Sequence, residues 1–454
     1  MGPIIDRRIF FKIAASGVAG YFASPLDIFG QSAVVTSDPT ATILNTAKNA
    51  IFILLAGAPS QTDTFDLRVG AWTPQNFDPV TINGIDWPGG LLNNLAGQLN
   101  LNRFSIIRSG QSTALVHSLV QNWTQIARNP TSATRKIAPN IGSVVALELE
   151  KQRSANQKIP AFLSLNGGGS LAGQGYYPGT YAPFDVTPNA NGITTLSNPD
   201  GQAVFTSRYN MLALTDASLR NTPAPYGTAI EAMGDFYSSA RNMMYDPGVS
   251  NAFRFVLADQ QKYGNSSFGN ACLTARNVLL SGLGTRYVQI TLGGWDNHQN
   301  IYAPNAGIYP SARQLDAGLA NLLVDLSVIP GSGGRSLLDD TLIVVKGEFG
   351  RTVGNITGQQ GRDHYFVHST LIAGGGVQGG RVIGKTTADG AYVEDPGWAQ
   401  DRPVYAEDIA ATIYSALGIN YTTVRHDDPL GRGFEYIPTT TPGYVGTPIT
   451  ELFR

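Results

Sequence analysis

Two Asp–His pairs are the residues best suited to chemistry in this sequence. Asp296 and His298 follow a strand predicted at 287–292, and Asp363 and His364 form a second pair. In an extended chain, side chains two residues apart point to the same side, so Asp296 and His298 converge. A carboxylate together with imidazoles suits Zn²⁺, Mn²⁺ or Fe²⁺.

Each pair taken alone is more often a hydrogen-bonded pair at the surface. Both pairs, however, lie in Gly-flanked turns after strands, and together they favour a metal site. We therefore expect Asp296, His298 and His364 to bind one divalent ion. Three protein ligands with an open position are typical of a catalytic metal.

Further acidic candidates follow two other strands. Glu348 comes directly after the apolar segment 341–346, where a buried carboxylate needs a cation or a partner. It is equally compatible with a metal ligand and with a salt bridge to an arginine. Asp63 and Asp66 lie after the strand predicted at 50–57, as further ligands or as residues of Asx-turns or helix caps.

Arginines and hydroxyl groups complete the candidate site. Arg351 and Arg362 could bind an anionic ester, since a guanidinium group matches phosphate or sulfate oxygens. Ser109 lies between a predicted strand and a predicted helix, near a helix N-terminus that favours anions. Capping of that helix is the alternative role for Ser109. The sequence has no Gly-x-Ser-x-Gly motif and no P-loop.

Strands and helices alternate along the chain from residue 50. Continuous apolar runs predict strands at 50–57, 104–108, 161–165, 287–292, 341–346 and 370–373. Helices are predicted at 113–127, 141–152, 227–244, 250–262, 270–282, 311–328 and 405–417. This alternation predicts an α/β fold, a doubly wound and mostly parallel sheet with helices on both faces. In such sheets, binding residues collect at the carboxyl ends of the strands.

We expect one domain over residues 45–454. Residues 166–225 are rich in Gly, Pro, Asn and Tyr, and predict long loops that form a cap over one end of the sheet. No linker long enough to separate two domains is evident.

Composition excludes several classes of protein. The net charge is −2 and basic residues do not cluster, which argues against a nucleic-acid partner. The single cysteine, Cys272, excludes an intramolecular disulfide and a thiolate metal cluster.

The N-terminus is typical of an exported protein. Arg7 and Arg8 precede a short apolar run at 13–23, the pattern of a twin-arginine signal. The run is too weak for a stable membrane span. We expect residues 1–35 to be a signal and leader. The twin-arginine export machinery would then be a partner, the location periplasmic or extracellular, and no transmembrane anchor would remain after export.

Several segments in order resemble the bacterial exported proteins grouped as domain of unknown function 1501. They are residues 55–66 (LAGAPSQTDTFD), 294–298 (GWDNH), 347–352 (GEFGRT), 361–364 (GRDH), 374–380 (GGGVQGG) and the tail at 408–419. The resemblance runs from about residue 50 to the C-terminus. It implies a fold similar to that of alkaline phosphatases and sulfatases.

The resemblance also implies roles for individual residues. Asp296, His298 and His364 match the His-containing metal site of that superfamily, for which we expect Zn²⁺ or Mn²⁺. Asp63 and Glu348 could form a second, oxygen-only site for Mg²⁺ or Ca²⁺. Ser109 lies roughly at the position of the nucleophile.

Two functions remain open at this point. One is metal-assisted hydrolysis of a phosphate or sulfate ester, either a small molecule or a glycan. The other is a catalytically degenerate exported protein that uses the same fold for binding or as a scaffold.

Export provides the first test. Replacing Arg7 and Arg8 with Lys should hold the protein in the cytoplasm, because the paired arginines are the recognised feature of the signal. Cell fractionation measures this. Continued export of the double variant by the twin-arginine route would contradict the prediction.

Overall fold

The computed structural model describes residues 34–221 and 227–453. Arg7, Arg8 and the apolar run after them lie outside the described residues. Among the helices in the described ranges, none has both the length and the apolar character that a membrane crossing requires.

The centre of the molecule is an eight-stranded sheet. Its spatial order is β13 (Val382–Ile383), β5 (Phe104–Gln111), β12 (Val367–Ala373), β9 (Thr341–Lys346), β2 (Asn49–Leu55), β8 (Tyr287–Leu292), β6 (Phe162–Leu165) and β7 (Phe184–Val186). All neighbours pair in parallel except β12, which is antiparallel to both β5 and β9. The predicted mostly parallel sheet is therefore confirmed.

Burial on both faces explains why the central strands read as unbroken apolar runs. Every residue of β2 and of β9 is buried. A strand with both faces covered needs aliphatic side chains in both directions, and β-branched residues fit its pleated backbone well. The sheet therefore requires a layer of helices on each face.

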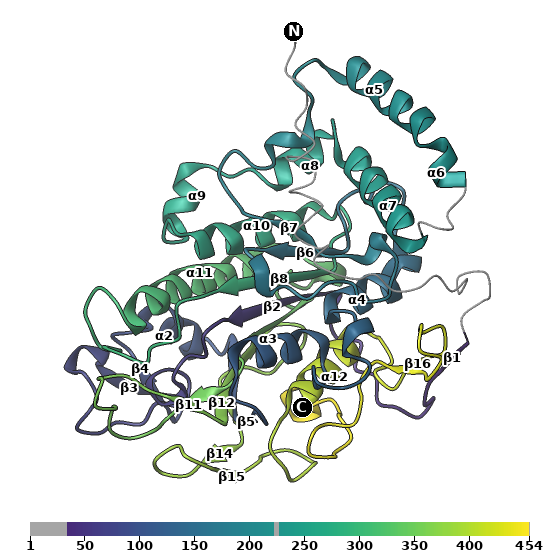
Figure 1. Ribbon diagram of the computed structural model, residues 1–454. Coiled ribbons are helices and arrows are strands. Elements are labelled where there is room, and N and C mark those ends of the chain that lie inside the picture. Colours follow the sequence, from purple (N-terminus) through teal and green to yellow (C-terminus); the bar gives the residue numbers. More distant parts are fainter. Residues whose placement is uncertain (1–33, 222–226, 454) are drawn as a thin grey trace.

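Two helical layers supply that cover (Figure 1). Helices α2 (Asn93–Asn100), α10 (Ser267–Ser281) and α11 (Ile308–Val328) pack in the core of one face. Helices α3 (His117–Ile126), α4 (Ile141–Leu149) and α12 (Ala406–Ala416) pack in the core of the other. The doubly wound arrangement expected from the sequence is thus observed.

The remaining elements lie around this body. The helices are α5 (Gln202–Thr215), α6 (Ala217–Asn221), α7 (Gly227–Met243), α8 (Pro247–Ala252) and α9 (Leu257–Lys262). The short strands are β1 (Val35–Thr36), β3 (Pro79–Ile82), β4 (Ile85–Pro88), β10 (Gly350–Arg351), β11 (His364–Tyr365), β14 (Lys385–Thr386), β15 (Val393–Asp395), β16 (Val424–Arg425) and β17 (Phe434–Glu435).

The long loops expected over 166–225 are interrupted by three regular elements, β7, α5 and α6. Strand β7 joins the edge of the central sheet, and α5 is a regular helix that projects from the body at the top of Figure 1. No residue of α5 is buried. Without a buried face, this helix has no apolar stripe by which the sequence could reveal it.

Strand β5 is longer than predicted and changes the surroundings of Ser109. The strand continues to Gln111, and α3 begins only at His117. Ser109 therefore lies inside a sheet strand and not near a helix N-terminus, which corrects the sequence-based placement.

The strand ends meet as predicted. Strands β2, β5, β8 and β9 run in one direction, so their carboxyl ends lie along a common edge of the sheet. Because β12 is antiparallel, its first residues lie at the same edge. The segments that carry the two predicted Asp–His pairs are brought together there.

A buried hydrogen bond joins α12 to α3 on one face of the sheet. The Trp123 indole donates to the Glu407 carboxylate at 2.8 Å, and Glu407 is only 2% exposed. Burial raises the pKa of Glu407 to about 7, although the Trp123 hydrogen bond opposes the rise. Folding therefore favours the protonated acid.

The sign of this shift predicts a pH dependence. Because the pKa of folded Glu407 exceeds the ordinary 4.5, its contribution to stability is fully present below about pH 4.5 and is lost as the pH rises through about 7. The Gln side chain in Glu407→Gln cannot ionise. The free energy of unfolding of this variant, minus that of the parent, should therefore be about 1–3 kcal/mol larger at about pH 8 than at about pH 5. Urea unfolding at both pH values measures the difference, with exposed Glu231→Gln as control. A difference that does not change with pH would contradict the assignment.

Candidate metal centre

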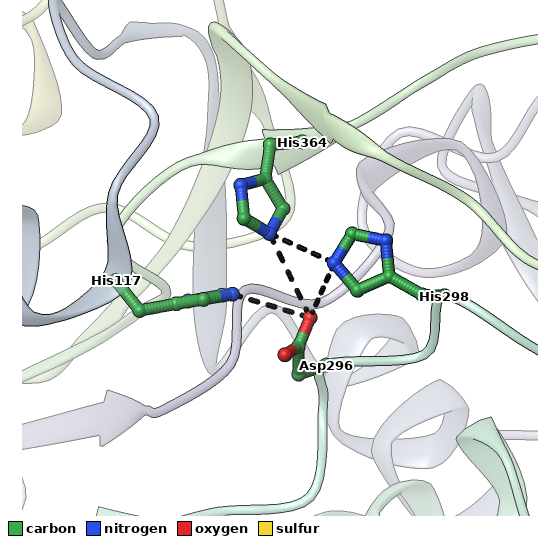
Figure 2. A group of neighbouring side chains, drawn as sticks. All are labelled: His117, Asp296, His298 and His364. Atoms are coloured by element: carbon green, nitrogen blue, oxygen red, sulfur yellow. Dashed lines mark hydrogen bonds and ion pairs between the residues drawn. The ribbon is translucent and has the colours of Figure 1, made fainter.

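Four side chains at the carboxyl edge of the sheet point toward one centre (Figure 2). They are His117, Asp296, His298 and His364, and one ligand atom from each lies within 4.8 Å of all the others. The three residues predicted to converge are therefore together. His117 joins them as a fourth.

The inner distances suit a shared ion. Asp296 Oδ1 lies 3.1 Å from His117 Nε2, 3.0 Å from His298 Nε2 and 3.7 Å from His364 Nε2. The Nε2 atoms of His298 and His364 are 3.0 Å apart. Ligands placed tetrahedrally at about 2.1 Å from an ion lie about 3.4 Å from one another. Four of the six donor pairs are 3.0–3.7 Å apart, and no pair is more than 4.8 Å apart.

Each imidazole is held from behind through Nδ1. His117 Nδ1 contacts Glu348 Oε1 at 2.6 Å, His298 Nδ1 contacts Asp363 Oδ1 at 2.8 Å, and His364 Nδ1 contacts the Leu115 carbonyl at 2.7 Å. An acceptor at Nδ1 fixes the hydrogen there and leaves the Nε2 lone pair free for a metal. All three rings therefore present the same nitrogen to the centre.

Three connections at the sheet edge supply the four residues. His117 is the first residue of α3, after β5. Asp296 and His298 lie in the loop after β8, and His364 lies in β11, just before β12. Gly57, after β2, packs against the Asp296 amide, and a Cβ there would lie 2.6 Å from that nitrogen. Its φ of 104° also favours glycine.

The Arg351 guanidinium lies behind the centre and is not free to bind a substrate. It donates to Asp296 at 2.6 Å, to the Ala58 carbonyl at 2.9 Å and to the Gly57 carbonyl. The residue is only 1% exposed. Its expected role as an ester clamp is not supported, because its donors are used inside the protein, where they position Asp296.

The surroundings of the centre favour the metal-binding forms of Asp296 and His364 but not that of His117. Partial burial raises the pKa of Asp296, but Arg351 and the nearby imidazoles outweigh it and hold the pKa below its ordinary value. Burial, together with the neighbouring charges, lowers the pKa of His364. The hydrogen bond that His117 donates to Glu348 raises the pKa of His117, so a metal would have to displace a proton there.

The donor set fits a borderline divalent ion. Three imidazoles and one carboxylate suit Zn²⁺, and also Mn²⁺ or Fe²⁺ when more positions are available. The set has one ligand more than the three predicted, so a tetrahedral ion would be fully ligated by protein. The Asp296 side chain is 47% exposed and that of His298 is 37% exposed, so solvent reaches the centre.

Sequence reasoning missed His117 as a ligand. The residue stands alone, without a neighbouring carboxylate, in a segment predicted to be the interior of a helix. Its position as the first residue of α3 depends on where β5 ends. The sequence signal that could have identified His117 as a ligand is its position shortly after β5, one of the strands that end at this edge.

Two predicted ligands prove to be outer partners. Glu348 and Asp363 are absent from the group of four and instead accept from His117 and His298. For Glu348, neither of the expected roles is observed, since its partner is an imidazole and not a metal or an arginine. Both carboxylates act by orienting a ligand.

Asp63 and Arg362 form a buried ion pair away from the four ligands. Arg362 Nε lies 2.7 Å from Asp63 Oδ2, and the Tyr302 hydroxyl donates to Asp63 Oδ1 at 2.8 Å. Arg362 also donates to the Thr352 and Gly354 carbonyls. Because both charges are satisfied in the interior, these contacts do not support the expected roles of Asp63 as a ligand of a second metal and of Arg362 as a substrate clamp.

Ser109 is also in the interior. Its hydroxyl is fully buried and donates to the Pro396 carbonyl at 2.9 Å. A nucleophile must reach both solvent and substrate, which this side chain does not. The assignment of Ser109 as catalytic is therefore not supported by its position.

Several solved structures resemble the chain at low sequence identity. A lipoteichoic acid synthase from Listeria monocytogenes is 12% identical, with 87% of this chain and 77% of that one covered and a TM-score of 0.37. A phosphonate monoester hydrolase from Silicibacter pomeroyi is 13% identical, with 89% and 76% covered and a TM-score of 0.39. A putative sulfatase from Bacteroides thetaiotaomicron is 10% identical, with 87% and 75% covered and a TM-score of 0.36. Because these TM-scores are below 0.5, no activity is transferred from them.

Family membership rests on the sequence itself. No curated protein matches it. The profile of the family described as "Protein of unknown function (DUF1501)" matches residues 47–436, which contain all four residues of the centre and every strand of the central sheet. This agrees with the motifs noted in the sequence. The protein belongs to the DUF1501 family.

Proposed function

We propose that this protein is a metal-dependent hydrolase that acts, after export, on phosphate or sulfate esters of small molecules or glycans. The observation that carries the proposal is the orientation of the three imidazoles. Each turns Nε2 to the shared centre while Nδ1 contacts an acceptor. Such outer partners are characteristic of metal-binding histidines.

His117, Asp296, His298 and His364 would hold the ion. A divalent ion bound there would polarise an ester oxygen and lower the pKa of water. The protein's own contributions are to keep the three rings in one tautomer and to keep Asp296 ionised. Both contributions are supported by contacts already present without metal.

The positions of the other candidates support a single metal and a water nucleophile. Asp63 and Glu348, expected at a second site, are engaged with Arg362 and His117. Ser109 is buried in β5. These positions support hydrolysis by activated water over attack by a serine.

The rival function is a non-catalytic binding or scaffold protein. The observation that favours it is the number of ligands, since a metal with four protein ligands is typical of structural zinc sites. The metal content of the purified protein, followed by assays with aryl phosphates and aryl sulfates, separates the two. Bound metal without turnover of either class would favour the rival.

The first test removes one ligand. His298→Ala should lower the affinity for Zn²⁺ by at least the roughly 10–100-fold lost when an outer partner is removed. Stability should change little, within about ±0.5 kcal/mol, because the side chain lies in a solvent-exposed loop. Titration calorimetry and thermal unfolding measure the two quantities.

His426→Ala is the matched control for this variant. His426 is exposed, contacts Thr36 and lies outside the group of four. Its variant should keep the parent affinity. If the parent and His298→Ala bind Zn²⁺ with equal affinity, His298 is not a ligand of the metal.

Two loops that carry the ligands are packed together at Gly361. The Arg362 amide donates to the Asn297 carbonyl at 3.0 Å, and the Ile301 amide donates to the Gln360 carbonyl at 2.8 Å. A Cβ on Gly361, between these bonds, would lie 2.0 Å from the His298 carbonyl carbon. Only glycine permits this approach, which sets the spacing between His298 and His364.

Gly361→Ala therefore tests the spacing without changing a ligand. The added methyl group must push the backbone of His298 away, so Zn²⁺ affinity should fall by about 10–100-fold. Gly358→Ala is the control in the same loop, because a Cβ there meets nothing within 4 Å. If Gly361→Ala binds Zn²⁺ like Gly358→Ala, the packing does not set the site.

A further inference from the structure

Three neighbouring aromatic side chains lie beside the metal centre, at the surface of the protein. Phe366 is 42% exposed, Tyr392 is 67% exposed, and Tyr365, which contacts both, is half-buried. The ring centroids of Tyr365 and Phe366 are 6.4 Å apart, and the side chains of Tyr365 and Tyr392 are hydrogen-bonded to each other. We call these three residues the aromatic rim. Contiguous exposed aromatic surface marks a binding site more often than singly scattered residues do.

The aromatic rim is tied to the segments that carry the metal ligands. Tyr365 and Phe366 follow His364 directly, so their Cα atoms lie within about 4 Å and about 8 Å of the His364 Cα. The Phe366 carbonyl also accepts from the Ser112 amide at 2.9 Å, in the segment that leads to His117. A molecule bound at the metal through one end can therefore reach the rim with a substituent of the size of one ring.

Tyr392 is supplied by the β14–β15 hairpin, which is anchored in the interior. At the base of the hairpin, the Thr386 hydroxyl donates to buried Asp66 at 2.5 Å and accepts from Arg68 at 2.7 Å. Near its tip, the Thr387 amide donates to the Tyr392 carbonyl at 2.8 Å. An aromatic side chain on a fixed backbone loses little conformational entropy when it binds a ligand.

The chemistry of the aromatic rim fits a sugar ring. A sugar has apolar C–H faces, which can pack on an aromatic ring, and hydroxyl groups around its edge. The two tyrosine hydroxyls, although bonded to each other, still offer one donor hydrogen and free acceptor lone pairs. An alkyl group would leave these hydroxyls without a role. A second anionic group is disfavoured, because the acidic side chains of Asp363 and Asp389 lie next to the rim.

We infer that the aromatic rim binds a sugar ring, with Phe366 against one face of the ring and Tyr365 and Tyr392 bonded to its hydroxyls, so that the substrates are esters of sugars. The inference deepens the proposed function and rests on it for the ester and the metal. Binding of the sugar itself needs neither metal nor turnover, so it can be tested separately.

The first experiment uses the metal-free protein. Saturation-transfer NMR measures binding of the methyl glycosides of glucose, galactose and N-acetylglucosamine, with hexanol as the apolar probe. At least one glycoside should bind, and more tightly than hexanol. Phe366→Ala should weaken its affinity about 3–10-fold through loss of ring packing, and Tyr392→Phe about 3-fold through loss of one hydroxyl. Leu257→Ala, which changes an exposed apolar side chain on α9, is the control and should keep the parent affinity.

The second experiment uses the protein loaded with Zn²⁺. The KM for the 6-sulfate or 6-phosphate of the bound sugar should rise about 3–10-fold in Phe366→Ala, while the KM for the corresponding ethyl ester should not change. Phe366 is exposed, so this variant should keep the fold.

The outcomes separate the inference from the proposed function. If no glycoside binds, if hexanol binds more tightly than every glycoside, or if Phe366→Ala and Tyr392→Phe both bind the sugar like the parent, the inference is overturned. If the parent binds a glycoside at the rim but neither holds Zn²⁺ nor hydrolyses any ester, the proposed function fails while the sugar site stands.

Discussion

The arrangement of the site depends on one buried carboxylate. Glu348 follows the most interior part of the sheet, where an ionised acid costs several kcal/mol unless its hydrogen bonds are replaced. Its Oε1 accepts hydrogen bonds from the Gly57 amide after β2 and from the side chains of His117 and Gln121 in α3. The end of one strand, the end of its neighbour and the start of a helix on one face are thereby held at fixed distances.

His117 and Asp296 take their positions from this junction. His117 is bound directly by the carboxylate, and Asp296 lies against Gly57, whose amide donates to the same oxygen. Arg351 adds a second tie, because it contacts Asp296 as well as the Gly57 carbonyl. The loop that carries His298 and the segment that carries His364 pack against each other at Gly361.

Much of this could be predicted from the sequence, because it depends on local patterns. Unbroken apolar runs revealed the strands, and polar residues at their ends revealed the edge where Asp296, His298 and His364 meet. His117 could not be recognised in the same way. Its place depends on the length of β5, and strand ends are set by pairing with β12 and not by the residues themselves.

Buried ion pairs were the other limit of prediction. Asp63, Arg362 and Arg351 have the residue types of a metal and anion site, and the sequence shows residue type without burial. Asp63 and Arg362 are far apart in the chain, yet each satisfies the charge of the other in the interior. Only the folded arrangement distinguishes such a structural pair from residues that face a substrate.

The dispersed origin of the four ligands has a consequence for the order of assembly. His117 comes from the first third of the chain and His364 from the last third, and the strands between them must be paired before the rings can meet. Local metal-binding modules gain their folding energy from the ion. Here the ion can enter only a finished sheet, so the nascent chain has no means of capturing it early, and chelation should leave the fold standing.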